Sequence, residues 1–170
     1  MTLSARIILG SSLFFLSLSI QAQQTLPDSL TMETLKGKKV NLKEYVANKN
    51  KVTIIIFWVT WSKPNQQELV SINANYLEDW QKKYDVELIA ISMDNERTTG
   101  RVKELTETKE WKFDILCNPD NSAFQELGFG TLPYTILLDA TGKIIYKRKG
   151  YIPGDEEELE TKISNLMIKK

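Results

Sequence analysis

Two runs of apolar residues dominate the pattern of hydrophobic and polar positions along the chain. Val52–Trp58 (VTIIIFW) and Val86–Ser92 (VELIAIS) are rich in β-branched and other apolar residues, which is typical of strands buried on both faces of a sheet. Between them, the apolar residues of Lys63–Tyr84 recur at helical spacing. A strand, a helix and a second strand predict a right-handed unit whose two strands are parallel.

Shorter segments on either side extend this unit into one α/β domain. The order of all segments predicts a mixed sheet covered by helices on both faces, and 170 residues suit one such core. The other predicted elements are an N-terminal hairpin (Leu30–Leu35 and Lys39–Leu42), a helical turn (Lys43–Val46), two helices (Thr98–Glu110 and Ser122–Leu127), a strand (Phe113–Leu116), a C-terminal hairpin (Tyr134–Asp139 and Lys143–Lys149), and a last helix that begins near Asp155.

The first 22 residues differ in composition from the rest. Met1–Arg6 carries a positive charge, Ile7–Ile20 is apolar, and Ala22 is a small residue suited to cleavage, which together are typical of a secretory signal peptide. The apolar run is short and rich in serine for a membrane span, and it lacks the amphipathic pattern of a buried helix. We therefore expect a signal peptide at residues 1–22, cleaved near Ala22, and a domain at residues 23–170. We also expect export to a bacterial periplasm or cell envelope, with no membrane span after cleavage.

The composition excludes several classes of site. The 22 basic and 22 acidic residues balance, so the charge gives no reason to expect nucleic acid as a partner. The chain has no histidine and one cysteine, Cys117. A Ser-His-Asp triad, a Cys-His pair, a His-ligated metal site and a redox dithiol within one chain are therefore excluded. We expect neither a metal nor a cofactor.

Several motifs together carry a resemblance to a known family. They are GKKVNL at Gly37–Leu42, FWVTW at Phe57–Trp61, GTLPYT at Gly130–Thr135, and the later pairs Leu138-Asp139 and Gly142-Lys143. With these motifs in this order, the chain resembles secreted thioredoxin-fold proteins of the TlpA-like thiol–disulfide oxidoreductase type, close to the redoxin (alkyl hydroperoxide reductase and thiol-specific antioxidant) group. The resemblance implies a thioredoxin-like fold with an N-terminal β-hairpin extension, and a cis peptide bond at Pro133 beside the redox pair.

The redox pair of that family is replaced in this chain. Relatives carry Trp-Cys-x-Pro-Cys where the first strand enters the first helix, and the helix N-terminus there favours a thiolate. Here Ser62 and Asn65 stand at the two cysteine positions, and neither residue can exchange disulfides. The catalytic role of the cysteines therefore does not carry over. Serine is a favoured N-cap residue, so we expect Ser62 to cap the helix.

Two other residues are candidates for retained chemistry. Glu68 matches an acid that assists proton transfer in some relatives; without thiols, we interpret it as a first-turn carboxylate favoured by the helix dipole. Cys117 has no nearby basic residue or helix start, which favours a buried, inert thiol. The alternative is a thiol-dependent oxidoreductase or peroxidase that acts through Cys117 or together with a thiol of a partner.

The preferred hypothesis is a non-catalytic binding or assembly module. The resemblance implies that Trp61 is exposed beside the former redox site and that the strand edge next to Pro133 can pair with an extended segment. We therefore expect a groove that binds a protein or peptide of the cell envelope. A purely structural subunit is a third possibility. The predicted groove residues are Trp61, Ser62, Lys63, Pro64, Leu132 and Pro133.

Overall fold

The computed structural model describes residues 24–168. The predicted signal peptide at residues 1–22 lies outside the described residues. Within the described range, no helix combines the length and the apolar character needed to cross a membrane.

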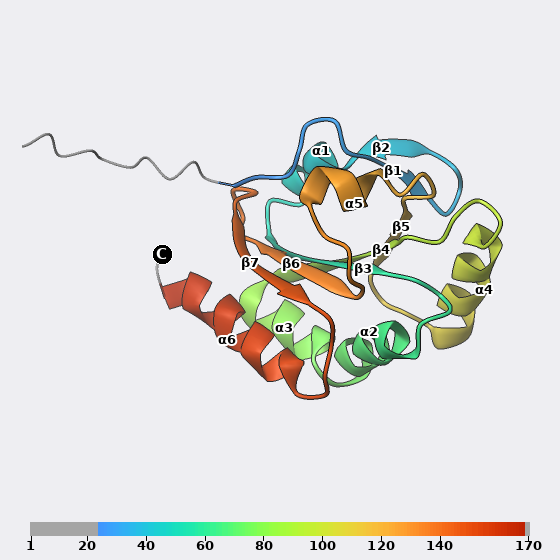
Figure 1. Ribbon diagram of the computed structural model, residues 1–170. Coiled ribbons are helices and arrows are strands. Elements are labelled where there is room, and N and C mark those ends of the chain that lie inside the picture. The colour runs from blue at the N-terminus through green and yellow to red at the C-terminus, as the bar shows by residue number, and fades with distance from the viewer. Residues whose placement is uncertain (1–23, 169–170) are drawn as a thin grey trace, which may run out of the picture.

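A seven-stranded mixed sheet forms the centre of the domain (Figure 1). The strand order is β2-β1-β5-β4-β3-β6-β7. The three strands β3, β4 and β5 run parallel, and every other neighbouring pair is antiparallel. The prediction of a mixed sheet with a hairpin at its N-terminal edge is confirmed. The strands are β1 (Thr31–Thr34), β2 (Lys39–Asn41), β3 (Val52–Trp58), β4 (Val86–Ser92), β5 (Asp114–Cys117), β6 (Tyr134–Leu138) and β7 (Ile144–Lys149).

Helices cover both faces of the sheet, as the sequence predicts. Figure 1 shows α1 and α5 on one face and α2, α3 and α6 on the other, with α4 towards the side. Val102 of α4 packs into the same core as α2, α3 and α6. The helices are α1 (Leu42–Ala47), α2 (Lys63–Asn75), α3 (Leu77–Tyr84), α4 (Thr99–Lys109), α5 (Ser122–Leu127) and α6 (Asp155–Ile168).

The apolar run of β3 supplies side chains to both cores. Ile54, Ile56 and Trp58 pack under α2, α3 and α6, whereas Ile55 and Phe57 pack on the opposite face with α1 and α5. Every residue of β3 is buried, because the strand lies between β4 and β6 and helices cover both of its faces. This central position fixes the location of the turn at residues 59–62, which follows β3.

The predicted helix over Lys63–Tyr84 is wrong in one respect. It is broken at Tyr76, which has φ −128° and separates α2 from α3. Apolar residues continue at helical spacing through the break, with Ile72 and Trp80 both buried in the same core, so periodicity alone gives no sign of it. The ring of Tyr76 packs against that of Trp80 at a centroid distance of 5.4 Å.

Candidate functional site

The site lies where the carboxyl ends of β3 and β4 meet at one edge of the sheet. Val59–Ser62 connects β3 to α2, and Met93–Asn95 directly follows β4. Because the two strands are parallel, their following loops lie side by side, which is the usual place for a site in an α/β sheet. The backbone N–H of Met93 donates to the carbonyl of Trp58 at 2.7 Å, and this bond holds the two loops together.

Asp94 fixes the turn that carries Trp61. Its Oδ2 accepts hydrogen bonds from the backbone N–H of Thr60 and the hydroxyl of Ser92, both at 2.8 Å. Its Oδ1 accepts from the hydroxyl of Thr60 at 2.7 Å. With both carboxylate oxygens engaged and the side chain buried, Asp94 positions the turn and is not free to act as a base.

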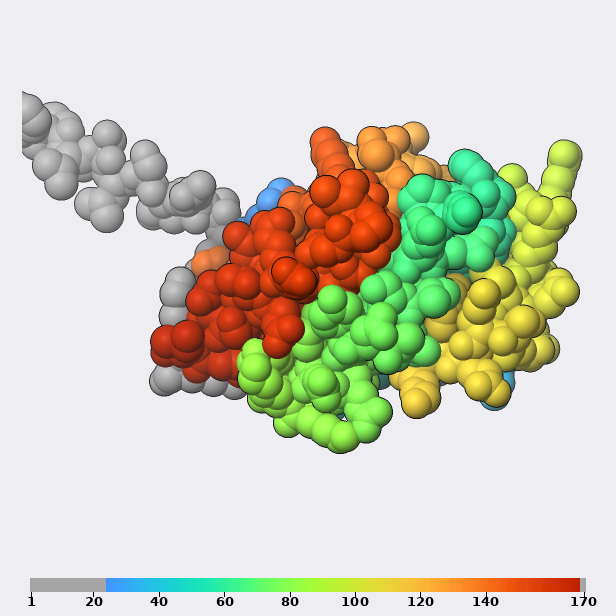
Figure 2. All heavy atoms as spheres, turned by 90° about the horizontal axis from the view of Figure 1, so that it is seen from below, coloured from blue at the N-terminus to red at the C-terminus, as the bar shows by residue number. Residues whose placement is uncertain are grey.

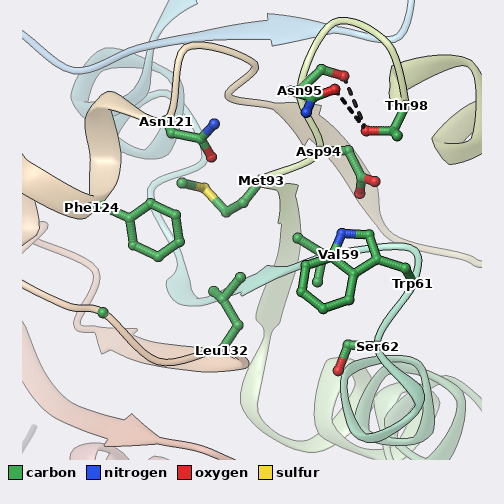
Figure 3. Close-up of a pocket in the computed structure, with 11 residues that line it drawn as sticks. Val59, Trp61, Ser62, Met93, Asp94, Asn95, Thr98, Asn121, Phe124 and Leu132 are labelled. Carbon is green, nitrogen blue, oxygen red and sulfur yellow. Dashed lines mark hydrogen bonds between the residues drawn. The ribbon is translucent and has the colours of Figure 1, made fainter.

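The expectation that the Ser62 hydroxyl caps α2 is wrong. Ser62 occupies the N-cap position with extended backbone, but its side chain makes no capping hydrogen bond. An N-cap oxygen normally accepts from the second or third N–H of the helix, and the second helical residue here is Pro64, which has no N–H. Ser62 is one of the residues that line the cavity described below (Figure 3).

Asn65, at the second former cysteine position, is fully buried. Its Oδ1 accepts a hydrogen bond of 2.9 Å from the backbone N–H of Val59. The side chain therefore ties the first turn of α2 to the end of β3. Its Nδ2 has no partner among the described residues. An amide committed to the backbone in this way has a structural task, and it offers no nucleophile.

The interpretation of Glu68 as a first-turn carboxylate is wrong. Glu68 lies beyond the first turn of α2 and is fully buried. Its Oε1 accepts from the hydroxyl of Thr135 at 3.0 Å and from Nη2 of Arg148. Arg148 lies between two lysines in the basic run Lys147–Lys149 of β7, yet its side chain is only 11% exposed. The sequence gives no sign of this buried ion pair, because its partners are 80 residues apart.

The surroundings of Glu68 also change its acidity. Burial raises the pKa of Glu68 to about 7, although Arg148 and the hydroxyl of Thr135 act to lower it. Glu156 and Asp155 add further negative charge nearby and raise the pKa. Burial raises the pKa of Glu68 because moving a carboxylate from water into the protein interior disfavours its charged form.

A cavity of about 460 Å³ opens beside the former redox positions, which is within the range of ligand pockets, roughly 300–1,000 Å³. In Figure 3, Trp61 lies on one side and Phe124 with Leu132 on the other. Val59 and Met93 add apolar surface between them. The polar residues at the rim are Asn95, Thr98 and Asn121, and the remaining lining residues are Ser62, Asp94 and Gly130.

The predicted groove residues fall into three groups. Trp61, Ser62 and Leu132 line the cavity. Lys63 and Pro64 are exposed at the start of α2, outside the cavity lining. Pro133 is buried, and the Leu132–Pro133 peptide bond is cis. The cis bond thus lies directly behind a cavity-lining residue.

Cys117 is not among the residues that line the cavity. The thiol is buried at the end of β5, in the core beneath α2 and α4. Burial raises the pKa of Cys117 to about 11, and the charges of Asp94 and Glu33 act in the same direction. A thiol with this pKa is protonated at neutral pH and is a poor nucleophile.

Sequence reasoning missed most of the cavity wall, because only Trp61, Ser62 and Leu132 of the lining residues were predicted. Met93, Asp94 and Asn95 could have been found, because they follow a predicted parallel strand next to the one that ends at Trp58. Asn121 and Phe124 come from α5 and its preceding loop, and no local pattern connects them to Trp61.

The comparisons with known proteins agree with this geometry. The pattern of the AhpC/TSA family matches residues 22–147, which is more than half of the chain. The chain belongs to the AhpC/TSA family. Thiol-disulfide oxidoreductase ResA of Bacillus thuringiensis subsp. konkukian is 33% identical over 116 residues, which cover 68% of this chain and 63% of the relative. The match thus spans less than two thirds of the length of this ResA relative.

Another relative and a solved structure extend the likeness. Sporulation thiol-disulfide oxidoreductase A of Bacillus subtilis is 25% identical over 125 residues, or 73% of this chain and 72% of that protein. A thioredoxin-like protein from Porphyromonas gingivalis has 32% identity and a TM-score of 0.71, covering 83% of this chain and 90% of that one. The thioredoxin-like fold is therefore established for this AhpC/TSA protein, which has one cysteine, Cys117, and has Ser62 and Asn65 where the family resemblance implies cysteines.

Proposed function

We propose that this AhpC/TSA protein is an exported, non-catalytic binding module, which holds an extended peptide segment of a cell-envelope protein against the cavity beside Trp61. One observation carries the proposal: the site has an exposed aromatic residue beside a partly apolar cavity, while Asn65 is buried and hydrogen-bonded to the backbone. The site thus keeps the means to bind and lacks the group that would react.

Trp61 has the properties of a binding anchor. It is 72% exposed, although its backbone turn is held by the buried Asp94. Large aromatic residues on rigid supports dominate the energy of many protein interfaces. Because the turn is already ordered, Trp61 loses little backbone freedom when a partner covers it. The apolar lining beside it supports a peptide that presents an aliphatic or aromatic side chain.

The backbone of Gly130–Leu132 supports an extended ligand. Within residues 24–168, the N–H and carbonyl groups of this segment form no hydrogen bond with the rest of the chain. Gly130 and Leu132 also line the cavity. A peptide laid along the segment could pair with these groups as an added strand, while one of its side chains enters the cavity. The carboxamides of Asn95 and Asn121 at the rim can hydrogen-bond its backbone.

Export is part of the proposal and rests on the composition of residues 1–22. Several relatives are thiol-disulfide oxidoreductases, and thiol–disulfide exchange requires a reactive cysteine thiolate. The single cysteine of this chain, Cys117, is buried. The protein therefore has the fold of the family and would bind a peptide without thiol–disulfide exchange.

The test starts from a phage-displayed library of cysteine-free peptides selected on the purified protein. A selected peptide is then titrated into isotope-labelled protein and followed by NMR. We expect the largest shifts at the indole N–H of Trp61 and the amides of Gly130–Leu132. Shifts confined to other surfaces, such as the pocket between α2 and the end of α4, would contradict the assignment of the site.

The enzymatic alternative is tested separately. Insulin disulfide reduction and peroxide consumption are measured for the wild type and for Cys117→Ser. We expect the wild type to show no activity above buffer. Activity that disappears in Cys117→Ser would overturn the non-catalytic part of the proposal and leave the peptide-binding part to the NMR experiment.

A further inference from the structure

A buried cation in β7 lies between carboxylates of two different helices. Nη2 of Arg148 donates to Oε1 of Glu68 in α2, and its Nη1 lies 3.1 Å from Oδ2 of Asp155 at the start of α6. The side chains of Arg148 and Asp155 are 11% and 17% exposed, and that of Glu68 is fully buried. These three residues are called the Arg148 triad below.

The Arg148 triad holds more negative than positive charge. Glu156, which is also buried, adds a third carboxylate to its surroundings. Two carboxylates thus contact one guanidinium and a third lies near Glu68, in a region of low dielectric where excess charge of one sign is costly. The groups that face Glu68 are the charged or titratable Arg148 of β7, Asp155 and Glu156 of α6 and Tyr151 of the preceding turn, together with the neutral hydroxyl of Thr135 in β6.

Glu68 is the carboxylate placed to take up a proton. Its Oε2 is buried without a hydrogen-bond partner among the described residues. Glu156 differs, because its Oε1 accepts from the hydroxyl of Tyr151 at 2.8 Å and its Oε2 accepts from the N–H of Gly154 at 3.1 Å. Burial raises the pKa of Glu68 to about 7 despite the opposing effects of Arg148 and Thr135, which supports the same choice.

Arg148 is aligned with only one of its two carboxylates. It hydrogen-bonds Glu68, but Nη1 forms no hydrogen bond of good geometry although Asp155 is within ion-pair distance. Its Nε also lacks a partner among the described residues. If Glu68 becomes neutral, its electrostatic attraction for the guanidinium of Arg148 weakens. Asp155 is then the nearest charged acceptor shown.

Asp155 in turn fastens an exposed surface turn. Its Oδ2 accepts a hydrogen bond of 2.9 Å from the backbone N–H of Ile152, and Ile152 is 69% exposed. The turn is also joined to the loop behind the cavity, because the N–H of Gly150 donates to the carbonyl of Pro133 at 2.8 Å. Figure 2 shows the segment between β7 and α6 lying beside α2 on the surface.

We propose that Arg148 is a two-position switch: uptake of a proton by Glu68 releases the guanidinium from α2, so that it hydrogen-bonds Asp155 and tightens the turn at Ile152. The proton comes from solvent and converts the carboxylate of Glu68 into a neutral acid. In the ionised state, Arg148 hydrogen-bonds Glu68 and lies within ion-pair distance of Asp155 without a well-aligned hydrogen bond to it, while Asp155 accepts from the N–H of Ile152. The proposed switch does not depend on the proposed peptide binding, because Arg148, Glu68 and Asp155 are not among the residues that line the cavity.

Amide hydrogen exchange of the purified protein tests the switch. Protection of the Ile152 N–H, corrected for intrinsic exchange rates, is measured by NMR at about pH 5.5 and about pH 8.5, on either side of the expected titration. We expect protection to be higher at the acidic pH by roughly threefold or more, because Asp155 is then held by Arg148. Equal protection at both pH values would overturn the proposal.

Three variants separate the switch from a general effect of pH. Glu68→Gln, which mimics the protonated acid, should show the acidic level of protection at both pH values. Asp155→Asn should show low protection at both. The control Glu158→Gln, on the exposed side of α6, should keep the wild-type response. A wild-type response in Glu68→Gln would overturn the proposal; if that variant does not fold, the wild type and Asp155→Asn decide.

Discussion

Oδ1 of Asn65 accepts a hydrogen bond of 2.9 Å from the backbone N–H of Val59. This bond joins the first turn of α2 to the end of β3 at a position where the family resemblance implies a cysteine. The side chain is fully buried, so solvent cannot replace it as the acceptor. Asn65 is therefore part of the framework that holds the turn of Trp61.

Asn65→Ala should destabilise the protein. The substitution removes the acceptor of a buried N–H, and such an unsatisfied group costs about 1–3 kcal/mol. Urea unfolding followed by circular dichroism measures the loss, with Gln67→Ala, an exposed position in the same helix, as the matched control. A midpoint shared by Asn65→Ala and the control would show that the bond contributes nothing.

Ser62→Ala should leave the stability almost unchanged. The hydroxyl of Ser62 makes no capping bond, whereas Oδ1 of Asn41 accepts from the N–H of Glu44 at 3.0 Å and caps α1. We therefore expect Asn41→Ala to lower the free energy of unfolding by about 1 kcal/mol, and Ser62→Ala to lower it by far less. Equal losses in the two variants would mean that Ser62 does cap its helix.

Glu68 should make the protein more stable in mild acid than in base. Its pKa in the folded protein is raised by burial from an ordinary 4.5 to about 7. Its contribution to stability is therefore complete below pH 4.5 and is lost as the pH rises through 7, with a total on the order of 3 kcal/mol at most. Denaturant unfolding across this range should show the decline in the wild type and not in Glu68→Gln. An unchanged decline in the variant would assign it to other groups.

Cys117 should react slowly with thiol reagents in the folded state. Burial raises its pKa to about 11 from an ordinary value of 9, which alone lowers the thiolate fraction at neutral pH roughly a hundredfold. Labelling in buffer and in urea compares the native with the unfolded rate. Similar rates in the two conditions would reveal an accessible thiol and favour the enzymatic alternative.

Local sequence patterns correctly predicted the strands that are buried along nearly their whole length. Val52–Trp58 and Val86–Ser92 are observed with the expected bounds, because strands buried on both faces require continuous apolar side chains. The break at Tyr76 could not be predicted, since the apolar residues on its two sides serve the same core and keep the same period.

The framework of the site was predictable, and its polar interior was not. The motif around Trp61 located the turn between β3 and α2, and the loss of both cysteines was evident from Ser62 and Asn65. The pairing of Glu68 with Arg148 depends on the antiparallel register of β6 and β7, where Thr135 faces Arg148. A contact of this kind between distant residues leaves no local trace, so a buried arginine had the same appearance as an exposed one.

The central claim, that Trp61 anchors a bound peptide without redox chemistry, is tested most directly by calorimetry. A selected cysteine-free peptide is titrated into the wild type, into Trp61→Ala and into Ile145→Ala, a control that truncates an exposed apolar residue of β7. We predict that Trp61→Ala raises the Kd by roughly thirtyfold or more, equivalent to about 2 kcal/mol, while the control binds like the wild type. Wild-type affinity in Trp61→Ala would contradict the account.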